Sequence, residues 1–123
     1  MNIYLIKNIY ELLNGKGKEF SLEITDHILN PYRSIIIFEG EYINGIRNGK
    51  GKEYDKYNGT LIFEGEYLNG KRNGKGKEYN EFGKLLYDGE YLNGKKNGKG
   101  KAYNQYGELE FKGEFMNGQR IYK

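Results

Sequence analysis

Apolar and polar side chains alternate one by one in the middle of this chain. Leu61, Phe63 and Tyr67 fall on one face of the stretch 61–68, whereas Glu64 and Glu66 fall on the other. A period of two residues predicts a β-strand. Two Asn-Gly steps, a second short strand over 75–79 and a polar link over 80–84 come next. Because Asn and Gly tolerate the positive φ of tight turns, we interpret the unit as a β-hairpin followed by a connecting turn.

The alternating strand ends in one phrase that is written four times: glycine, glutamate, an aromatic residue, an apolar residue, asparagine, glycine. Its leading glycines are Gly40, Gly65, Gly89 and Gly113, which are 25, 24 and 24 residues apart. A fixed period in this range predicts a stack of one supersecondary unit. The fold class that we expect is therefore all-β, a single elongated, twisted antiparallel sheet of stacked hairpins.

We divide the chain into a single repeat domain, 1–123. Its parts are a degenerate N-terminal unit with an insertion (1–35), full repeats at 36–60, 61–84 and 85–108, and a truncated repeat at 109–123. We expect a capping element at the N-terminus, either a degenerate strand or a short amphipathic helix, because terminal repeats are usually atypical. At the other end the chain stops inside a hairpin, so we expect the last sheet edge to be uncovered or closed by another chain.

The hairpin register can be predicted if Lys71 and Arg72 form the tip of the turn. Tyr67 then faces Gly76, and Glu66 faces Lys77. An aromatic ring over a glycine and an opposite-charge cross-strand pair both stabilise sheets. The same pairing recurs in two other units, as Tyr42/Gly51 with Glu41/Lys52 and as Tyr91/Gly100 with Glu90/Lys101.

The composition is compatible with a thin core. Hydrophobic residues make up 37% of the chain, and the mean hydropathy is −0.89. Such polarity is common in disordered proteins. However, 15% aromatic content, a net charge of +3 and the strict periodicity favour a folded solenoid. No signal peptide or membrane helix is evident, and the chain has no cysteine, so we expect a cytoplasmic protein, either free or peripheral to a membrane.

The phrase over 63–76 resembles the MORN (membrane occupation and recognition nexus) repeat. The resemblance covers 36–118, with a partial unit at 4–20. It implies an elongated, twisted antiparallel sheet that acts as a scaffold or a protein-binding array, with no catalytic motif. It also implies that binding of anionic phospholipid headgroups is an alternative role.

Three features of the sequence could carry chemistry, and none of them predicts an enzyme. The carboxylate pairs Glu39/Glu41, Glu64/Glu66 and Asp88/Glu90 recur in register beside lysines, which indicates cross-strand salt bridges instead of one active site. His27 is the only histidine, so a metal site is not expected. No hydroxyl nucleophile sits beside a histidine or in a glycine elbow. We therefore expect no enzymatic activity, no cofactor and no metal.

Two surfaces are candidates for partner binding. The aromatic rows are either core alone or the floor of a groove for a protein partner; they contain Phe38, Tyr42, Phe63, Tyr67, Tyr87, Tyr91, Phe111 and Phe115. The basic hairpin tips are either a solvated edge or a contact for an anionic membrane or an acidic protein; they contain Arg47, Lys71, Arg72, Lys95 and Lys96. Our leading hypothesis is protein binding or self-association through the aromatic face or a sheet edge. Binding to an anionic membrane is the alternative, and a repeat protein without a dedicated ligand is a third hypothesis. Nucleic-acid binding is not expected at a net charge of +3.

Overall fold

The computed structural model describes residues 3–6, 14–26, 28–29 and 31–123. Ten strands form one antiparallel sheet in chain order. They are β1 (Ile3–Ile6), β2 (Asn14–Ile24), β3 (Tyr32–Ile43), β4 (Ile46–Tyr54), β5 (Leu61–Leu68), β6 (Lys71–Tyr79), β7 (Leu85–Leu92), β8 (Lys95–Tyr103), β9 (Leu109–Met116) and β10 (Gln119–Ile121). The all-β fold class is confirmed.

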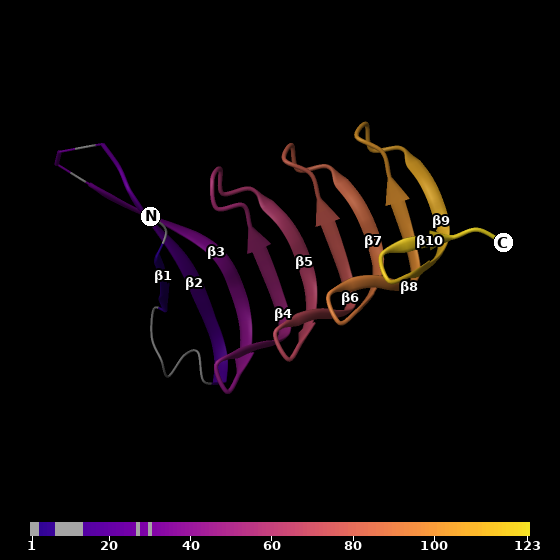
Figure 1. Cartoon of the computed structure of the whole chain (residues 1–123), viewed down its shortest axis with the longest axis horizontal. Helices are drawn as coiled ribbons and strands as arrows, with labels where there is room; N and C mark the ends of the chain where they lie inside the picture. Colours follow the sequence, from indigo (N-terminus) through magenta and orange to yellow (C-terminus); the bar gives the residue numbers. More distant parts are fainter. Residues whose placement is uncertain (1–2, 7–13, 27, 30) are drawn as a thin grey trace.

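The strands stack into an elongated array with curved strands (Figure 1). Tight hairpin turns join β3 to β4, β5 to β6 and β7 to β8 at one long edge, and the connecting turns lie along the opposite edge. At the N-terminus, Ile3–Ile6 pairs with β2, so this part of the expected capping element is a strand. Residues 7–13 and His27 lie outside the described residues.

The tip of each hairpin is an Asn-Gly pair, and not the basic pair that was predicted. Leu68 pairs with Lys71, which leaves Asn69 and Gly70 as a two-residue loop with φ of 51° and 85°. Two successive positive φ values are the requirement of a type I′ turn, whose twist matches that of the flanking strands. Lys71 and Arg72 therefore begin β6, which is four residues longer at its start than the predicted strand over 75–79.

The predicted register is wrong by four residues next to the turn, and by two residues from Gly65 onward. Gly65 faces Gly76 and Glu64 faces Lys77, whereas Tyr67 faces Arg72. The other two units differ in the same way. Their observed pairs are Gly40/Gly51 with Glu39/Lys52, and Gly89/Gly100 with Asp88/Lys101. The error has a physical cause, because moving the tip to Asn-Gly shifts the pairing, and a β-bulge between Gly65 and Tyr67 absorbs the extra residues of β6.

A row of glycines crosses the sheet as a result, one from each of eight neighbouring strands. We call it the glycine row; it contains Gly17, Gly40, Gly51, Gly65, Gly76, Gly89, Gly100 and Gly113, each paired with the next. A methyl group on Gly76 would lie 2.5 Å from Cζ of Phe63 and 3.2 Å from Cε2 of Tyr91. The predicted principle of rings over bare backbone is therefore correct, but different rings cover each glycine.

The long strands bend at the glycine row. The ring centroids of Phe38 and Tyr42 are 5.7 Å apart although the residues are four positions apart, which in a straight strand is about 13 Å. The bend turns both rings toward each other on one side of the sheet, which we call the ring face; the opposite side is the outer face. A single layer can thus bury side chains, because its own two halves fold around them.

The core on the ring face is a continuous chain of rings, which Phe111 and the exposed Tyr122 extend at its C-terminal end. Neighbouring rings meet edge to face at 5.1–5.7 Å, in the order Tyr42, Phe38, Tyr67, Phe63, Tyr91, Tyr87, Phe115, Phe111, Tyr122. Each contact of this kind contributes about 0.5–1.5 kcal/mol beyond the area that it buries. The chain links every repeat to the next, so the rows predicted from the 24-residue period are the core.

Replacing Gly76 with Ala tests the ring contact. The added methyl group collides with Phe63, which is fully buried and cannot move aside. We expect the free energy of unfolding to fall by about 1–3 kcal/mol, as for other overpacked cores. Urea unfolding followed by circular dichroism measures it. Lys77→Ala, next along the strand and exposed, is the control, and equal effects of the two substitutions would contradict the proposed contact.

Candidate interaction surfaces

A row of cations covers the ring chain from the solvent side. The guanidinium carbon of Arg47 lies 4.0 Å from the ring centroid of Phe38, and that of Arg72 lies 4.0 Å from Phe63. Lys96 takes the same position 4.8 Å above Tyr87. These cations come from the start of β4, β6 and β8, where the strand leaves its Asn-Gly turn. Cation–π contacts in this setting replace the second protein layer that usually covers a sheet.

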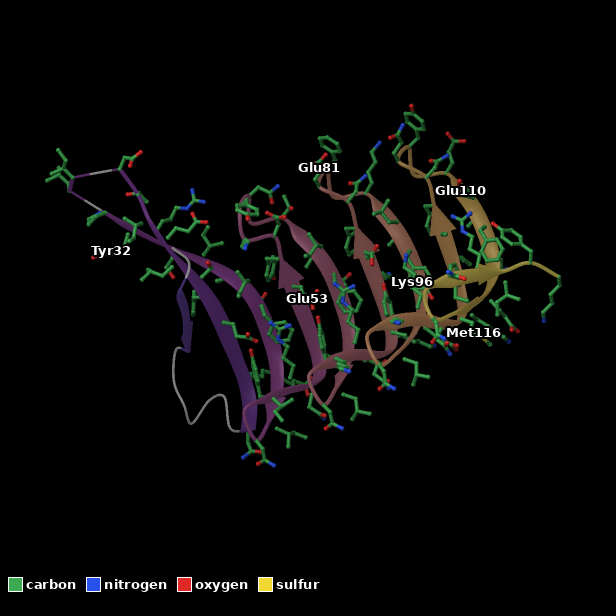
Figure 2. All side chains as sticks on the ribbon, viewed as in Figure 1. Tyr32, Glu53, Glu81, Lys96, Glu110 and Met116 are labelled. Carbon is green, nitrogen blue, oxygen red and sulfur yellow. The ribbon has the colours of Figure 1, made fainter. Side chains whose placement is uncertain are left out.

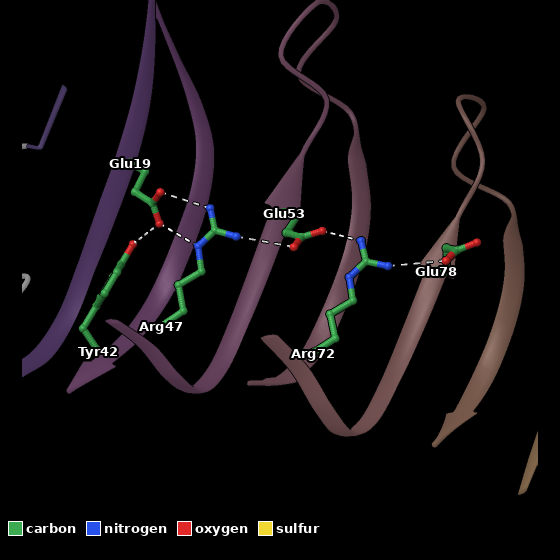
Figure 3. A network of polar contacts seen from close by, with 6 residues as sticks. All are labelled: Glu19, Tyr42, Arg47, Glu53, Arg72 and Glu78. Atoms are coloured by element: carbon green, nitrogen blue, oxygen red, sulfur yellow. Dashed lines mark hydrogen bonds and ion pairs between the residues drawn. The ribbon is translucent and has the colours of Figure 1, made fainter. Parts of the chain in front are cut away.

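Carboxylates join these cations into one polar ladder (Figure 3). Arg47 donates to both oxygens of Glu19, at 2.7 and 3.0 Å. Its remaining Nη lies 3.5 Å from Glu53, which also accepts a hydrogen bond from Arg72. The same links continue through Glu78 to Lys96, at 3.5 and 3.8 Å. Each arginine therefore bridges two repeats.

The ladder holds its carboxylate charges in place. Burial alone would raise the pKa of Glu19, but hydrogen bonds from Arg47 and Tyr42 outweigh it and leave that pKa below its usual value. The Tyr42 hydroxyl donates to Glu19 at 2.7 Å, and its own pKa is raised by burial and by this bond. A network with its charges paired in this way stabilises the fold.

The ladder stops at β8, where the repeat changes. Glu19, Glu53 and Glu78 occupy one repeat position, and Ala102 occupies it in β8. Arg120 stands where the next cation belongs, but it pairs with Glu110 at 3.1 Å. The C-terminal end of the array therefore has one acid fewer on its ring face.

This arrangement changes the interpretation of the predicted basic surface. Arg47, Arg72 and Lys96 do not lie at the hairpin tips. Their side chains are partly buried and form ion pairs on the ring face. Lys71 and Lys95 are exposed. They face Leu68 and Leu92 across the hairpin, and these leucines are about half exposed. The tip edge is thus mixed apolar and basic.

The predicted aromatic binding face is also revised. Seven of its eight residues are buried, at 0–5% exposure, and only Phe111 is partly open; the seven are Phe38, Tyr42, Phe63, Tyr67, Tyr87, Tyr91 and Phe115. Their burial corrects the expectation that an aromatic row floors an open groove. These rings form the core beneath the row of cations.

The outer face carries the repeated carboxylate pairs. Lysines stand directly opposite Glu39, Glu64 and Asp88, in other pairs than those predicted. Among the described residues no ion pair within 4.0 Å joins these facing side chains, so the predicted cross-strand salt bridges are not formed. Glu64 also accepts a hydrogen bond from the Tyr79 hydroxyl at 2.6 Å, and Glu90 accepts one from the backbone of Lys99 at 2.9 Å. Among the described residues, no group of three His, Cys, Asp or Glu could hold a metal ion.

The connecting turns display one exposed aromatic residue each, and the sequence analysis missed them. We call Tyr57, Phe82 and Tyr106 the turn aromatics; 68%, 80% and 68% of their surfaces are exposed. Each backbone N–H donates to the side chain of the Asp or Asn that begins its turn, at 2.8–2.9 Å. Glu81, labelled in Figure 2, marks the outer tip of one such turn. The signal was an aromatic residue two places after each turn-starting Asp or Asn.

The stacked hairpins correspond to a known repeat family. A model of the MORN repeat matches residues 38–59, 63–80 and 87–103. The chain belongs to the MORN repeat family. MORN repeats are binding modules, commonly for proteins or membranes, and they are generally non-enzymatic. A comparison with curated proteins gave no match. No helix within the described part of this MORN protein is long and apolar enough to cross a bilayer.

Extending the ladder of this MORN array should stabilise it. In Ala102→Glu the new carboxylate lies between Lys96 and Arg120 and next to Tyr87 and Phe111, as Glu53 lies between Arg47 and Arg72. We expect the free energy of unfolding to rise by up to about 1 kcal/mol and the gain to shrink at high salt. Thermal unfolding measures it. Ala102→Gln is the uncharged control, and an equal gain from both variants would show that charge is not the cause.

Alkaline pH should unfold the protein through its tyrosines. Burial and hydrogen bonds to Glu39 and Glu64 raise the pKa of Tyr54 and Tyr79 to about 12, from the usual 10.0. The folded state holds these protons more tightly, so its stability is complete below pH 10 and declines as the pH rises toward about 12. Urea unfolding at increasing pH measures the decline. Tyr79→Phe should make the decline less steep, and an unchanged slope would contradict this assignment.

Proposed function

We propose that this MORN protein is a non-enzymatic protein-binding module that contacts its partner along the connecting-turn edge. The turn aromatics support the proposal. Large aromatic side chains are enriched at the energetic centres of protein interfaces, where they bury a large area at a small entropic cost. All three are largely exposed, and the contact that the ring of Tyr57 makes with its neighbour Lys56, at 5.1 Å, is a local one on the surface of the turn.

The turns hold these residues in a defined position before any partner arrives. In the turn of Phe82, Asn80 accepts the backbone N–H groups of both Phe82 and Lys84, each at 2.9 Å. Gly83 provides the positive φ that closes the turn. Two strands separate neighbouring turns, so successive aromatic residues lie about 10 Å apart. A pre-organised row loses little entropy on binding, which favours affinity.

The sheet edge is a second part of the same proposal. β10 pairs with β9 only through Glu114–Met116, which leaves the outer backbone of 109–113 without a strand partner among the described residues. Exposed strand edges accept an added strand from a peptide or from another copy of the chain. Addition at this edge would extend the array without disturbing the ring chain.

Peripheral binding to an anionic membrane is the other candidate function. The observation that favours it is the tip edge, where exposed Lys71 and Lys95 face half-exposed Leu68 and Leu92. Apolar side chains that enter a bilayer interface beside lysines that contact its headgroups are a general means of peripheral attachment. Because Arg47, Arg72 and Lys96 are committed to the ladder, this candidate has fewer cations than the sequence analysis assigned to it.

One pair of variants separates the two functions. The turn variant replaces Tyr57, Phe82 and Tyr106 with Ser, and the tip variant replaces Leu68 and Leu92 with Ser. Both sets are exposed, so we expect neither variant to lose its fold. Cross-linking capture from a cell extract should lose its partners at least about tenfold with the turn variant alone, the effect of removing a hot spot.

The same two variants are then sedimented with vesicles that contain phosphatidylserine. Vesicle binding that only the tip variant abolishes would favour the membrane candidate instead. Protein capture that survives in the turn variant would contradict the proposed partner edge.

A further inference from the structure

The outer face contains a groove whose floor is the backbone of the glycine row. The charged residues on either side of the glycine in each strand point to the outer face and stand up as two ridges, because side chains alternate and a Cβ at the glycine itself would point to the ring face. One part of the groove, from β6 to the C-terminal end, has a volume of about 890 Å³. This site is separate from the connecting-turn edge, and its function would go beyond the one proposed above.

One ridge of this groove alternates in charge from strand to strand. We call it the charge row; its members, each opposite the next, are Lys18, Glu39, Lys52, Glu64, Lys77, Asp88, Lys101 and Lys112. Opposite charges facing each other stabilise a sheet, whereas like charges weaken it. The alternation explains how a chain with 30% charged residues keeps this face stable.

The alternation fails at one place, where Lys101 faces Lys112. An acid occupies the position of Lys112 in each of the other three repeats. Among the described residues, neither Lys101 nor Lys112 has an ion-pair partner within 4.0 Å, and both are exposed. Lys101 faces Asp88 on its other side, whereas Lys112 faces no acid of the charge row. The fold thus places one ammonium group without a facing carboxylate beside a second ammonium group at the wall of a groove.

The surroundings of this pair are also positive. Five lysines line this part of the groove, namely Lys75, Lys99, Lys101, Lys112 and Lys123, against the three acids Asp88, Glu90 and Glu114. Two of the acids already have partners, because Glu90 accepts the backbone N–H of Lys99 at 2.9 Å and Glu114 lies 3.8 Å from Lys123. The net charge of the lining is therefore +2, five minus three.

We propose that this end of the groove binds a phosphoryl group carried by a protein segment. A phosphoryl dianion has nearly two negative charges and three acceptor oxygens, so a single group can satisfy both Lys101 and Lys112. Tyr122 and Ile121 line the same space and offer apolar contact to the residues beside the phosphorylated one. Binding removes the repulsion between the two lysines. A phosphoryl group should therefore bind more tightly at this repeat than at the others, where an acid faces the lysine.

A protein segment fits this site better than a bilayer does. In the rest of the groove lysines alternate with carboxylates on both ridges, six lysines with five acids, so this part is nearly neutral. A bilayer that covers the outer face would gain little there, because its phosphates attract the lysines and repel the carboxylates. A short segment entering the C-terminal end meets only the lysine-rich part.

The test compares two charge reversals in the full chain. Lys112→Glu restores the alternation opposite Lys101, so we expect the protein to remain folded and at least as stable. Lys84→Glu makes the same change of charge on an exposed connecting turn and is the control. The probe is a Gly/Ala peptide with one phosphoserine, and its unphosphorylated form, inorganic phosphate and phosphatidylserine vesicles are the comparisons. Binding is followed by ¹H–¹⁵N chemical-shift changes.

We expect the phosphopeptide to shift the resonances of Lys101 and Lys112, and its affinity to fall at least about tenfold in Lys112→Glu but not in Lys84→Glu. Equal affinity of the phosphorylated and unphosphorylated peptides, or equal affinity of both variants, overturns the proposal. Inorganic phosphate that binds as tightly as the phosphopeptide, or vesicles that bind through Lys112 when the peptide does not, overturn the protein segment as its source. Capture through the turn aromatics is measured independently, so either proposal can fail alone.

Discussion

The structure depends on the contact between aromatic rings and the bare backbone of the glycine row. Gly51 and Gly76 lie directly beneath rings that a single methyl group would displace, and the strands bend there so that rings four residues apart touch. A single sheet normally has no interior. Here the bend makes one, and the edge-to-face chain of rings carries it from repeat to repeat.

The polar composition follows from the same constraint. No second layer covers the rings within the described residues, and arginines held by glutamates cover them instead. Arg47 and Arg72 each contact a ring and two carboxylates, so one side chain closes the core and ties neighbouring repeats together. Charged residues that would suggest a binding surface in another fold are structural in this MORN array. The positions that break the pattern, Ala102 and Lys112, are consequently the informative ones.

Much of the fold was accessible from the sequence, and less of the candidate surfaces was. Period-two alternation and the 24-residue phrase predicted the hairpins, the stacking and the aromatic rows. The register was wrong because Asn69-Gly70 and Lys71-Arg72 both suited a turn, and residue types alone do not count the extra residues of a bulge. Arg47 and Arg72 were assigned to a solvent edge because the carboxylates that hold them most closely, Glu19 and Glu53, come from the preceding repeat, 28 and 19 residues away.

The sequence by itself determined that a hairpin is repeated and which side chains share a face, because alternation and turn chemistry act between near neighbours along the chain. Tertiary structure decided which of these side chains are accessible. The bend at the glycine row closed the aromatic residues inside, drew Arg47 and Arg72 over them, and left Tyr57, Phe82 and Tyr106 outside. That division depends on contacts between strands of different repeats, whose distances follow only from the register and the curvature of the whole sheet.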